Sequence, residues 1–221
     1  MKKKPAMAEL LGIMARLRAP KGCPWDREQD HNSLRFHAVE EAYELMDAIE
    51  ARDDHEMLEE LGDLLLQVVF HCQLARERGA FDFEAVARRL AEKLFRRHPH
   101  VFGDSKVKDV DAVWAQWDRI KRAEKQGTRH ERPSALDGIP RHLPALMRVE
   151  KLAKKARKAN LLASSKNRRP TKAAVARQLF ELAAMAQERG WSAEALLRAE
   201  SQQRERAWRR QERAAQGRQP L

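Results

Sequence analysis

The chain has 221 residues and a formal net charge of +11, and 35% of its residues are charged. A chain of this length holds one or two domains with a real core, and its composition excludes a collagen-like or disulfide-rich protein. Its apolar runs are far shorter than the roughly 20 residues that cross a bilayer, so we expect no membrane helix and no membrane partner.

The N-terminus and the two cysteines indicate a cytoplasmic protein. Three lysines after Met1 resemble the start of a signal peptide, but Glu9 and Arg16 interrupt the apolar stretch that a signal peptide needs. Cys23 and Cys72 lie far apart, in no pattern typical of a zinc site or a disulfide framework. We therefore expect both cysteines to be reduced thiols.

Helical periodicity runs through nearly the whole sequence, and alternating strand patterns are absent, so we predict an all-α protein. A first helix is predicted over residues 7–18, followed by a loop that carries Trp25. A second helix is predicted from Ser33, a good N-cap residue, to Arg52. Its inward-facing side chains are predicted to be Val39, Ala42, Leu45, Met46 and Ile49.

The third predicted helix starts at Asp53, which has capping-box spacing to Glu56, and ends before Gly79. It is expected to form an antiparallel hairpin with the second helix. Its core-facing side chains are predicted to be Leu61, Leu64, Leu65, Val68 and Cys72. A fourth helix is predicted over residues 83–97 and a fifth over 110–125.

Four acids of this hairpin stand in two pairs, Glu41 with Glu44 and Glu60 with Asp63, each with the i, i+3 spacing of one helix face. The second pair borders the apolar run LLLQVVF, where an ionised carboxylate without a cationic partner is costly to bury. On the third helix the polar stripe consists of Glu60, Asp63, Gln67 and His71. Two acid pairs on neighbouring helices predict a pocket for a hard metal ion.

The other polar residues point to a metal-assisted phosphate chemistry. Four carboxylates with no cysteine nearby favour Mg²⁺ or Mn²⁺ over Zn²⁺, and Mg²⁺ in proteins is usually completed by waters and substrate phosphates. Cations that follow in the sequence, including Lys93, Arg97 and Lys121, suit the charge that develops on a leaving phosphate. The absence of a P-loop or kinase-type glycine-rich loop favours hydrolysis by water.

Six motifs follow one another over residues 8 to 155. They are GCPWD (22–26), EEAYE (40–44), EELGD (59–63), KLFRRHPHVF (93–102), WDRIK (117–121) and LDGIPRHLPA (136–145). In this order they resemble the MazG-type nucleoside triphosphate pyrophosphohydrolases of the all-α NTP pyrophosphatase superfamily. The family's signature of ExxE, a spacer and ExxD matches with 15 residues between the acid pairs.

The resemblance implies hydrolysis of an NTP or dNTP to the monophosphate and pyrophosphate, as in cleansing of the nucleotide pool. It implies that Mg²⁺ is bound by Glu41, Glu44, Glu60 and Asp63. It places Lys93, Arg96 and Arg97 near the phosphates, and Trp25, Trp117 and Lys121 near the nucleotide. It also implies a MazG-like helical bundle that forms a homodimer, or a higher homo-oligomer, with a four-helix core. The catalytic water's partner and the preferred base and sugar stay open.

We expect three parts along the chain: a MazG-like catalytic domain over residues 1–130, a linker and connecting helix over 131–155, and a degenerate basic helical unit over 156–221. The sequence LARERG that ends at Gly79 returns as MAQERG ending at Gly190. This offset leaves the second copy without acids for a metal. Residues 160–172 are predicted to be a loop that replaces a lost helix.

Two other functions stay open. Residues 131–221 carry 21 Lys and Arg against 9 Asp and Glu, so a non-catalytic nucleotide-sensing or nucleic-acid-associated regulatory protein is the main alternative. A solvated helix face explains this charge more simply, because no aromatic interleaving accompanies it. A di-iron bundle would need two ExxH pairs, and the sequence has one, from Glu28 to His31.

Overall fold

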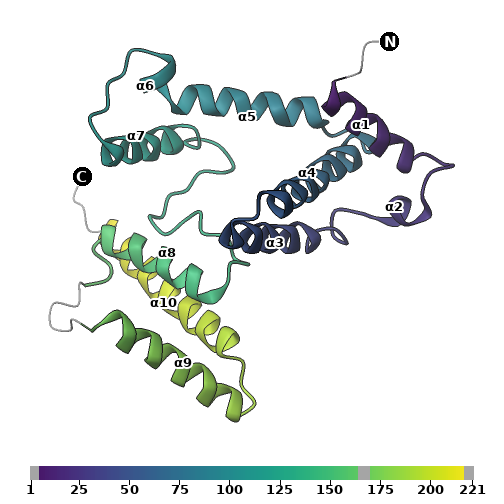
Figure 1. Ribbon diagram of the computed structural model, residues 1–221. Helices are drawn as coiled ribbons and strands as arrows, with labels where there is room; N and C mark the ends of the chain where they lie inside the picture. Colours follow the sequence, from purple (N-terminus) through teal and green to yellow (C-terminus); the bar gives the residue numbers. More distant parts are fainter. Residues whose placement is uncertain (1–4, 164–169, 217–221) are drawn as a thin grey trace. The chain divides into compact units, whose positions relative to one another are not determined.

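A computed structural model describes residues 5–163 and 170–216 of the chain (Figure 1). Every regular element in this part is helical, which confirms the predicted all-α class. The contacts within the chain divide it into two compact units, residues 1–110 and 111–221. None of the helices described is long and apolar enough to cross a membrane.

The described part of the first unit contains a helical hairpin and four further helices. Its helices are α1 (Ala6–Leu17), α2 (Pro24–Glu28), α3 (His37–Ala51), α4 (Asp54–Glu77), α5 (Phe83–Arg97) and α6 (Pro99–Phe102). The hairpin consists of α3 and α4, which only two residues connect, so the two helices run antiparallel (Figure 1).

The ends of α4 follow the predicted signals. The Asp53 carboxylate accepts hydrogen bonds from the backbone N–H groups of His55 and Glu56, at 2.9 and 3.2 Å, which confirms it as the N-cap. At the other end Gly79 has a φ of +68°, the left-handed conformation that stops a helix. Arg52, which joins α3 to α4, also has a positive φ of 57°.

Two local predictions are wrong. Trp25 lies in the short helix α2, not in a loop, because Pro24 at its first turn already has the φ of a helix. Ser33 does not cap α3. Its hydroxyl accepts a hydrogen bond from the backbone N–H of Asp30 at 3.0 Å, within a turn that delays the start of α3 to His37. The Asp30 carboxylate stabilises this turn by accepting from two backbone N–H groups.

The core of the first unit lies against the C-terminal half of α4. Its buried side chains are Met14, Leu34, Val69, Phe70 and Leu74. Partly buried residues of α1 pack on this cluster, as does Phe83 at the start of α5. The N-terminal half of α4 has none of these neighbours, so there it packs mainly on α3.

Several predicted core positions of the hairpin are exposed in the single chain. They are Ala42 and five larger residues that are 40–53% exposed: Val39, Met46, Ile49, Leu61 and Val68. The periodicity correctly placed these residues on apolar stripes, but the prediction that they are inward-facing is wrong for one chain. The reason is that α1 and α5 cover only the far half of α4. Each hairpin helix therefore keeps an apolar stripe in contact with water.

The second unit consists of α7 (Val110–Ala123), α8 (Ala145–Lys158), α9 (Lys172–Glu188) and α10 (Ala193–Gln216). Leu136, Leu152 and Ala156 form its buried core, with Trp208 packed against them. The LDGIPRHLPA motif lies along α10. Within it the Asp137 carboxylate pairs with an arginine of α10 at 2.7 Å.

The repeated sequence produces the same helix end twice. Gly190 after α9 has a φ of +70°, close to that of Gly79 after α4. The N–H of Trp191 donates to the carbonyl oxygen of Ala186 at 2.9 Å, as the N–H of Ala80 does to Ala75 at 2.9 Å. Of the predicted loop 160–172, residues 164–169 lie outside the described part, and Lys172 already belongs to α9.

Candidate metal centre

The two acid pairs meet where α3 and α4 pack together. The carboxylates of Glu41, Glu60 and Asp63 each offer an oxygen, and these three oxygens lie within 4.8 Å of one another. All three side chains are half-buried. Glu44, one turn after Glu41 on α3, is more exposed. Two helices therefore contribute to one group of carboxylates.

These carboxylates destabilise one another's charge. Burial raises the pKa of Glu41, and the charges of Asp63 and Glu44 raise it further. The pKa of Glu60 is also raised, first by burial and then by Glu44 and Asp63. This means that Glu44, although exposed, lies close enough to act on both. Together the four acids form a strongly electronegative site.

A divalent cation fits this donor set. Glu60 Oε2 is buried and has no hydrogen-bond partner among the residues that the structure describes. A buried carboxylate oxygen without a partner is costly, and a bound cation would compensate it. Carboxylate oxygens are the ligands that Mg²⁺ and Mn²⁺ prefer. The residues present therefore match the predicted ion.

Gln67, which the sequence showed only as part of a polar stripe, joins this site. It follows Asp63 by one helical turn and is 7% exposed. Its amide nitrogen donates to Glu41 Oε1 across the hairpin, at 3.5 Å. The signal for this role was one polar residue inside the run LLLQVVF. Spacing alone gave no information about its partner on α3.

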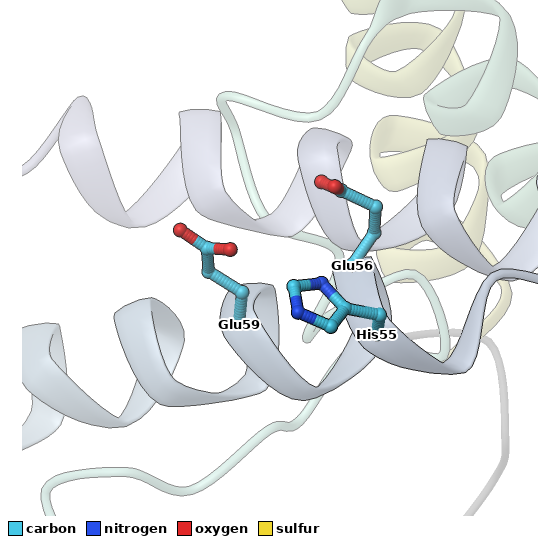
Figure 2. Close-up of side chains that lie close together, drawn as sticks. All are labelled: His55, Glu56 and Glu59. Atoms are coloured by element: carbon cyan, nitrogen blue, oxygen red, sulfur yellow. The ribbon is translucent and has the colours of Figure 1, made fainter.

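A second group of possible ligands, His55, Glu56 and Glu59, lies in the first turns of α4 (Figure 2). All three side chains are exposed and come from one helix. Acids near a helix N-terminus are stabilised by the helix dipole, so this group does not require a cation. It differs in this respect from the half-buried carboxylates that two helices bring together.

The predicted phosphate-binding cations lie near the end of α5. Lys93 and Arg97 are half-buried there and Arg96 is exposed. Phe95 stacks on Phe102 with ring centroids 5.1 Å apart, which fixes α6 against α5. From their shared end near α1, α4 and α5 diverge (Figure 1). Contact between these cations and a bound substrate stays a prediction.

The predicted nucleotide-binding residues are divided between the units. Trp25 is 54% exposed on α2 and makes edge contacts with His37 and Phe70. Trp117 and Lys121 lie together on α7 of the second unit, with the ammonium group 5.6 Å from the centre of the indole ring. Their part in nucleotide binding also stays a prediction.

His71, the last residue of the polar stripe on α4, has a partner. Its Nδ1 lies 2.8 Å from Nδ1 of His31, and the two rings stack with an interplanar angle of 11°. Burial lowers the pKa of His71, and the nearby His31 lowers it further. This pair connects the turn before α3 to α4. On α4 it lies about two turns after Asp63, toward the C-terminal end of the helix.

Comparison with known proteins places this site in a family context. The model of the MazG nucleotide pyrophosphohydrolase domain matches residues 29–102, which include all four acids. A nucleoside triphosphate pyrophosphohydrolase of Escherichia coli (strain K12) is 50% identical over 148 residues, or 66% of this chain and 55% of that protein. The nucleoside triphosphate pyrophosphohydrolase/pyrophosphatase MazG of Thermotoga maritima is 49% identical over 148 residues, or 67% of this chain and 55% of that protein.

A third relative is similar over more of its length. An uncharacterized 26.1 kDa protein of Streptomyces cacaoi is 42% identical over 197 residues, which are 87% of this chain and 77% of that protein. By contrast, the chain spans little more than half the length of the two pyrophosphohydrolases.

Proposed function

This chain belongs to the MazG nucleotide pyrophosphohydrolase family, and on that premise we propose that it hydrolyses nucleoside triphosphates to the monophosphate and pyrophosphate. The observation that carries the proposal is the group of three carboxylates, Glu41, Glu60 and Asp63, whose oxygens lie within 4.8 Å of one another. The named pyrophosphohydrolases that the chain resembles support the same activity. The substrate class is an NTP or dNTP.

The proposed cofactor is Mg²⁺, with Mn²⁺ as a substitute, held by Glu41, Glu44, Glu60 and Asp63. When bound, such an ion polarises phosphate oxygens and neutralises charge that develops as the bond to the leaving group breaks. The protein's own part is to hold the acids close together, against their mutual repulsion. Their half-buried position limits the access of bulk water.

Basic and aromatic side chains are proposed to bind the rest of the substrate. Lys93, Arg96 and Arg97 would contact the phosphates, since guanidinium and ammonium groups match phosphate oxygens in charge and hydrogen bonding. Trp25, Trp117 and Lys121 would contact the nucleotide. In support of this, the half-exposed Trp25 lies within the same unit as the carboxylates, beside the first turn of α3.

We also propose that two copies of the chain form a homodimer through the hairpin. Val39, Tyr43, Met46 and Ile49 follow one stripe of α3 and are about half-exposed. Leu58, Leu61 and Val68 follow a stripe of α4 and are 40–73% exposed. Two such hairpins would bury these stripes in a four-helix core, whose interhelical packing is typical of bundles. A second copy would also cover the exposed apolar stripes of α3 and α4, which α1 and α5 of the same chain leave open.

The basic second unit is not favoured as a nucleic-acid surface. Several arginines of α10 are engaged within the unit: Arg198 donates to the carbonyl oxygen of Leu143 at 2.9 Å, and Arg209 pairs with Asp137 at 2.7 Å. Arg204 pairs with Glu200 on the same helix. The two ion pairs offset part of the positive charge that the sequence concentrates there. The unit is instead proposed to be a degenerate copy without a metal site.

The activity is tested by incubating the protein with a panel of NTPs and dNTPs plus Mg²⁺ and separating the products by anion exchange. We expect monophosphate and pyrophosphate. Nucleoside diphosphate with inorganic phosphate would contradict the proposed site of cleavage. Glu60→Ala and Asp63→Ala are each expected to reduce turnover by about 100-fold or more.

A matched control separates loss of the ion from loss of charge in general. Glu50 is an exposed acid on α3, the helix that also carries Glu41. Glu50→Ala should retain the turnover of the unmodified protein. Equal turnover in all three variants would refute the assignment of the carboxylates.

A further inference from the structure

The first unit contains one buried polar side chain among its described residues, that of Gln67. It lies on α4 between Leu66 and Val68, in a stretch whose other residues are apolar. An apolar residue of similar size would pack there without leaving polar atoms away from water. A buried amide at this place therefore calls for a chemical explanation.

The orientation of this amide is determined by its neighbour. Glu41 Oε1 lies 3.5 Å from the amide nitrogen, and an ionised carboxylate only accepts hydrogen bonds, so the nitrogen must face Glu41. The carbonyl oxygen Oε1 of Gln67 then points elsewhere. That oxygen is buried and has no donor among the described residues.

Two acceptor oxygens that find no partner in the described part of the chain thus lie on one face of α4. Glu60 Oε2 is the other, two turns before Gln67 on the same helix face. A hydrated cation at the carboxylates would supply what both oxygens lack, since Mg²⁺ and Mn²⁺ usually keep several waters and these waters donate hydrogen bonds. At 3.5 Å the bond to Glu41 is at the long end of the range for a hydrogen bond.

We propose that Gln67 is a positioning residue for the metal centre. Its amide nitrogen holds the Glu41 carboxylate toward Glu60 and Asp63, and its carbonyl oxygen accepts a hydrogen bond from a water of the bound ion. This inference rests on the proposed function, because it assumes that the carboxylates bind a divalent cation. It goes beyond that function by giving a role to a residue outside the four acids.

The test is the affinity of the substrate-free protein for Mn²⁺, measured by electron paramagnetic resonance of the free ion. Gln67→Met keeps the size of the side chain and removes both polar groups. We expect its affinity for Mn²⁺ to fall by about 10- to 100-fold, the range found when groups that support metal ligands are removed. We expect its melting temperature without metal to be unchanged or higher, because the buried oxygen without a partner is gone.

A control on the same helix is Gln73→Met. Gln73 is half-buried and donates to Glu77 at 2.9 Å, away from the acid pairs in sequence. Its replacement should leave the affinity for Mn²⁺ unchanged. A purely structural role of Gln67 predicts the reverse pattern for Gln67→Met, a lower melting temperature with unchanged affinity, and that result would overturn the proposal.

Two further outcomes keep the inference separate from the function on which it rests. If the unmodified protein binds Mn²⁺ and Glu60→Gln does not, while Gln67→Met binds as tightly as the unmodified protein, only the inference fails. If the unmodified protein binds no Mn²⁺, both fail. Should Gln67→Met not fold, Gln67→Asn withdraws the amide by one methylene, and unchanged affinity in that variant would equally refute the proposal.

Discussion

Arg18 and Glu77 form a bidentate ion pair, with Nε and Nη2 of the arginine each 2.7 Å from a carboxylate oxygen. The same guanidinium donates to the carbonyl oxygens of Asp26 and Gln29 and lies 5.5 Å from the centre of the Phe70 ring. One side chain thus connects the end of α1, helix α2 and the end of α4.

We expect Arg18→Ala to destabilise the protein by about 2–3 kcal/mol, because it removes charge-assisted hydrogen bonds and leaves two carbonyl groups without a donor. The measurement is urea unfolding at pH 7. Arg88→Ala is the control, since Arg88 makes an exposed pair with Glu84 one turn away, and it should cost no more than about 0.5 kcal/mol. Equal losses in the two variants would contradict the role given to Arg18.

If the carboxylates bind a divalent cation as proposed, the stability of the protein should depend on that cation. Mg²⁺ should stabilise the unmodified protein against heat by about 2.7 kcal/mol when the free ion is at 100 times its Kd, and excess EDTA should abolish the gain. Glu60→Gln should be at least as stable as the unmodified protein in EDTA, because one charge of a repulsive group is removed. It should show no gain with Mg²⁺. Differential scanning fluorimetry measures both effects.

Glu59→Gln provides the comparison for this experiment. Glu59 is the neighbour of Glu60 in sequence but belongs to the exposed group drawn in Figure 2. It should keep most of the stabilisation by Mg²⁺. If Glu59→Gln lost the stabilisation by Mg²⁺ and Glu60→Gln kept it, the metal site would have to be assigned to the exposed group instead.

The connection between α3 and α4 is strained at one residue. Arg52 has φ 57° and ψ 36°, a left-handed conformation that a side chain disfavours and glycine adopts freely. Arg52→Gly should therefore stabilise the protein by about 0.5–1 kcal/mol in urea unfolding. Arg78→Gly, at the end of α4 with φ −93°, has no such strain to relieve and should be neutral or destabilising. A stabilisation that is the same in both would not support this explanation.

The His31–His71 contact should make stability fall in mild acid. The pKa of His71 is lowered from its ordinary value of 6.5 by burial and then by His31, so the folded protein favours the neutral ring. The unfolded chain therefore binds the proton more readily, and the stability that this neutral ring contributes is complete above about pH 6.5 and is lost as the pH falls below it. Unfolding free energies between pH 8 and pH 5 should decline less steeply in His71→Gln. Parallel profiles would show that this histidine is not responsible.

The apolar stripe of α3 should determine the oligomeric state. Met46 is 51% exposed in the single chain, so Met46→Glu should change the stability of one copy little while placing a charge in the proposed four-helix core. Sedimentation should show a dimer for the unmodified protein and a monomer for Met46→Glu. Phe180→Glu replaces a residue that is 75% exposed on α9, and it should leave the dimer intact. A monomeric unmodified protein would refute the proposed dimer.

The sequence predicted those features of the fold that depend on residues close to one another in the chain. Asp53 and Gly79 act on backbone groups within a few residues, so both ends of α4 were predictable. The start of α3 was not, since the Ser33 hydroxyl accepts from the backbone N–H of Asp30 in a turn before the helix. The periodicity identified the apolar stripe that includes Met46, but a period cannot tell what covers a stripe.

The same limit applies to the candidate site. The i, i+3 spacing identified the acid pairs, because two carboxylates on one helix face are a local pattern. The hydrogen bond from Gln67 to Glu41 and the pairing of His71 with His31 join residues far apart in sequence. Such contacts depend on how the helices pack. A polar residue in an apolar run shows that a partner is needed without showing which one.

The two-residue connection between α3 and α4 has a consequence for how the protein acquires its site. All four acids lie between residues 41 and 63, so one short loop closure brings them together, and the entropy lost in closing a loop rises with its length. We expect contacts of this kind to form earlier in folding than contacts between distant segments. On this expectation the four carboxylates come together before the rest of the first unit has folded, and a divalent cation bound at that stage would favour the native pairing of α3 and α4.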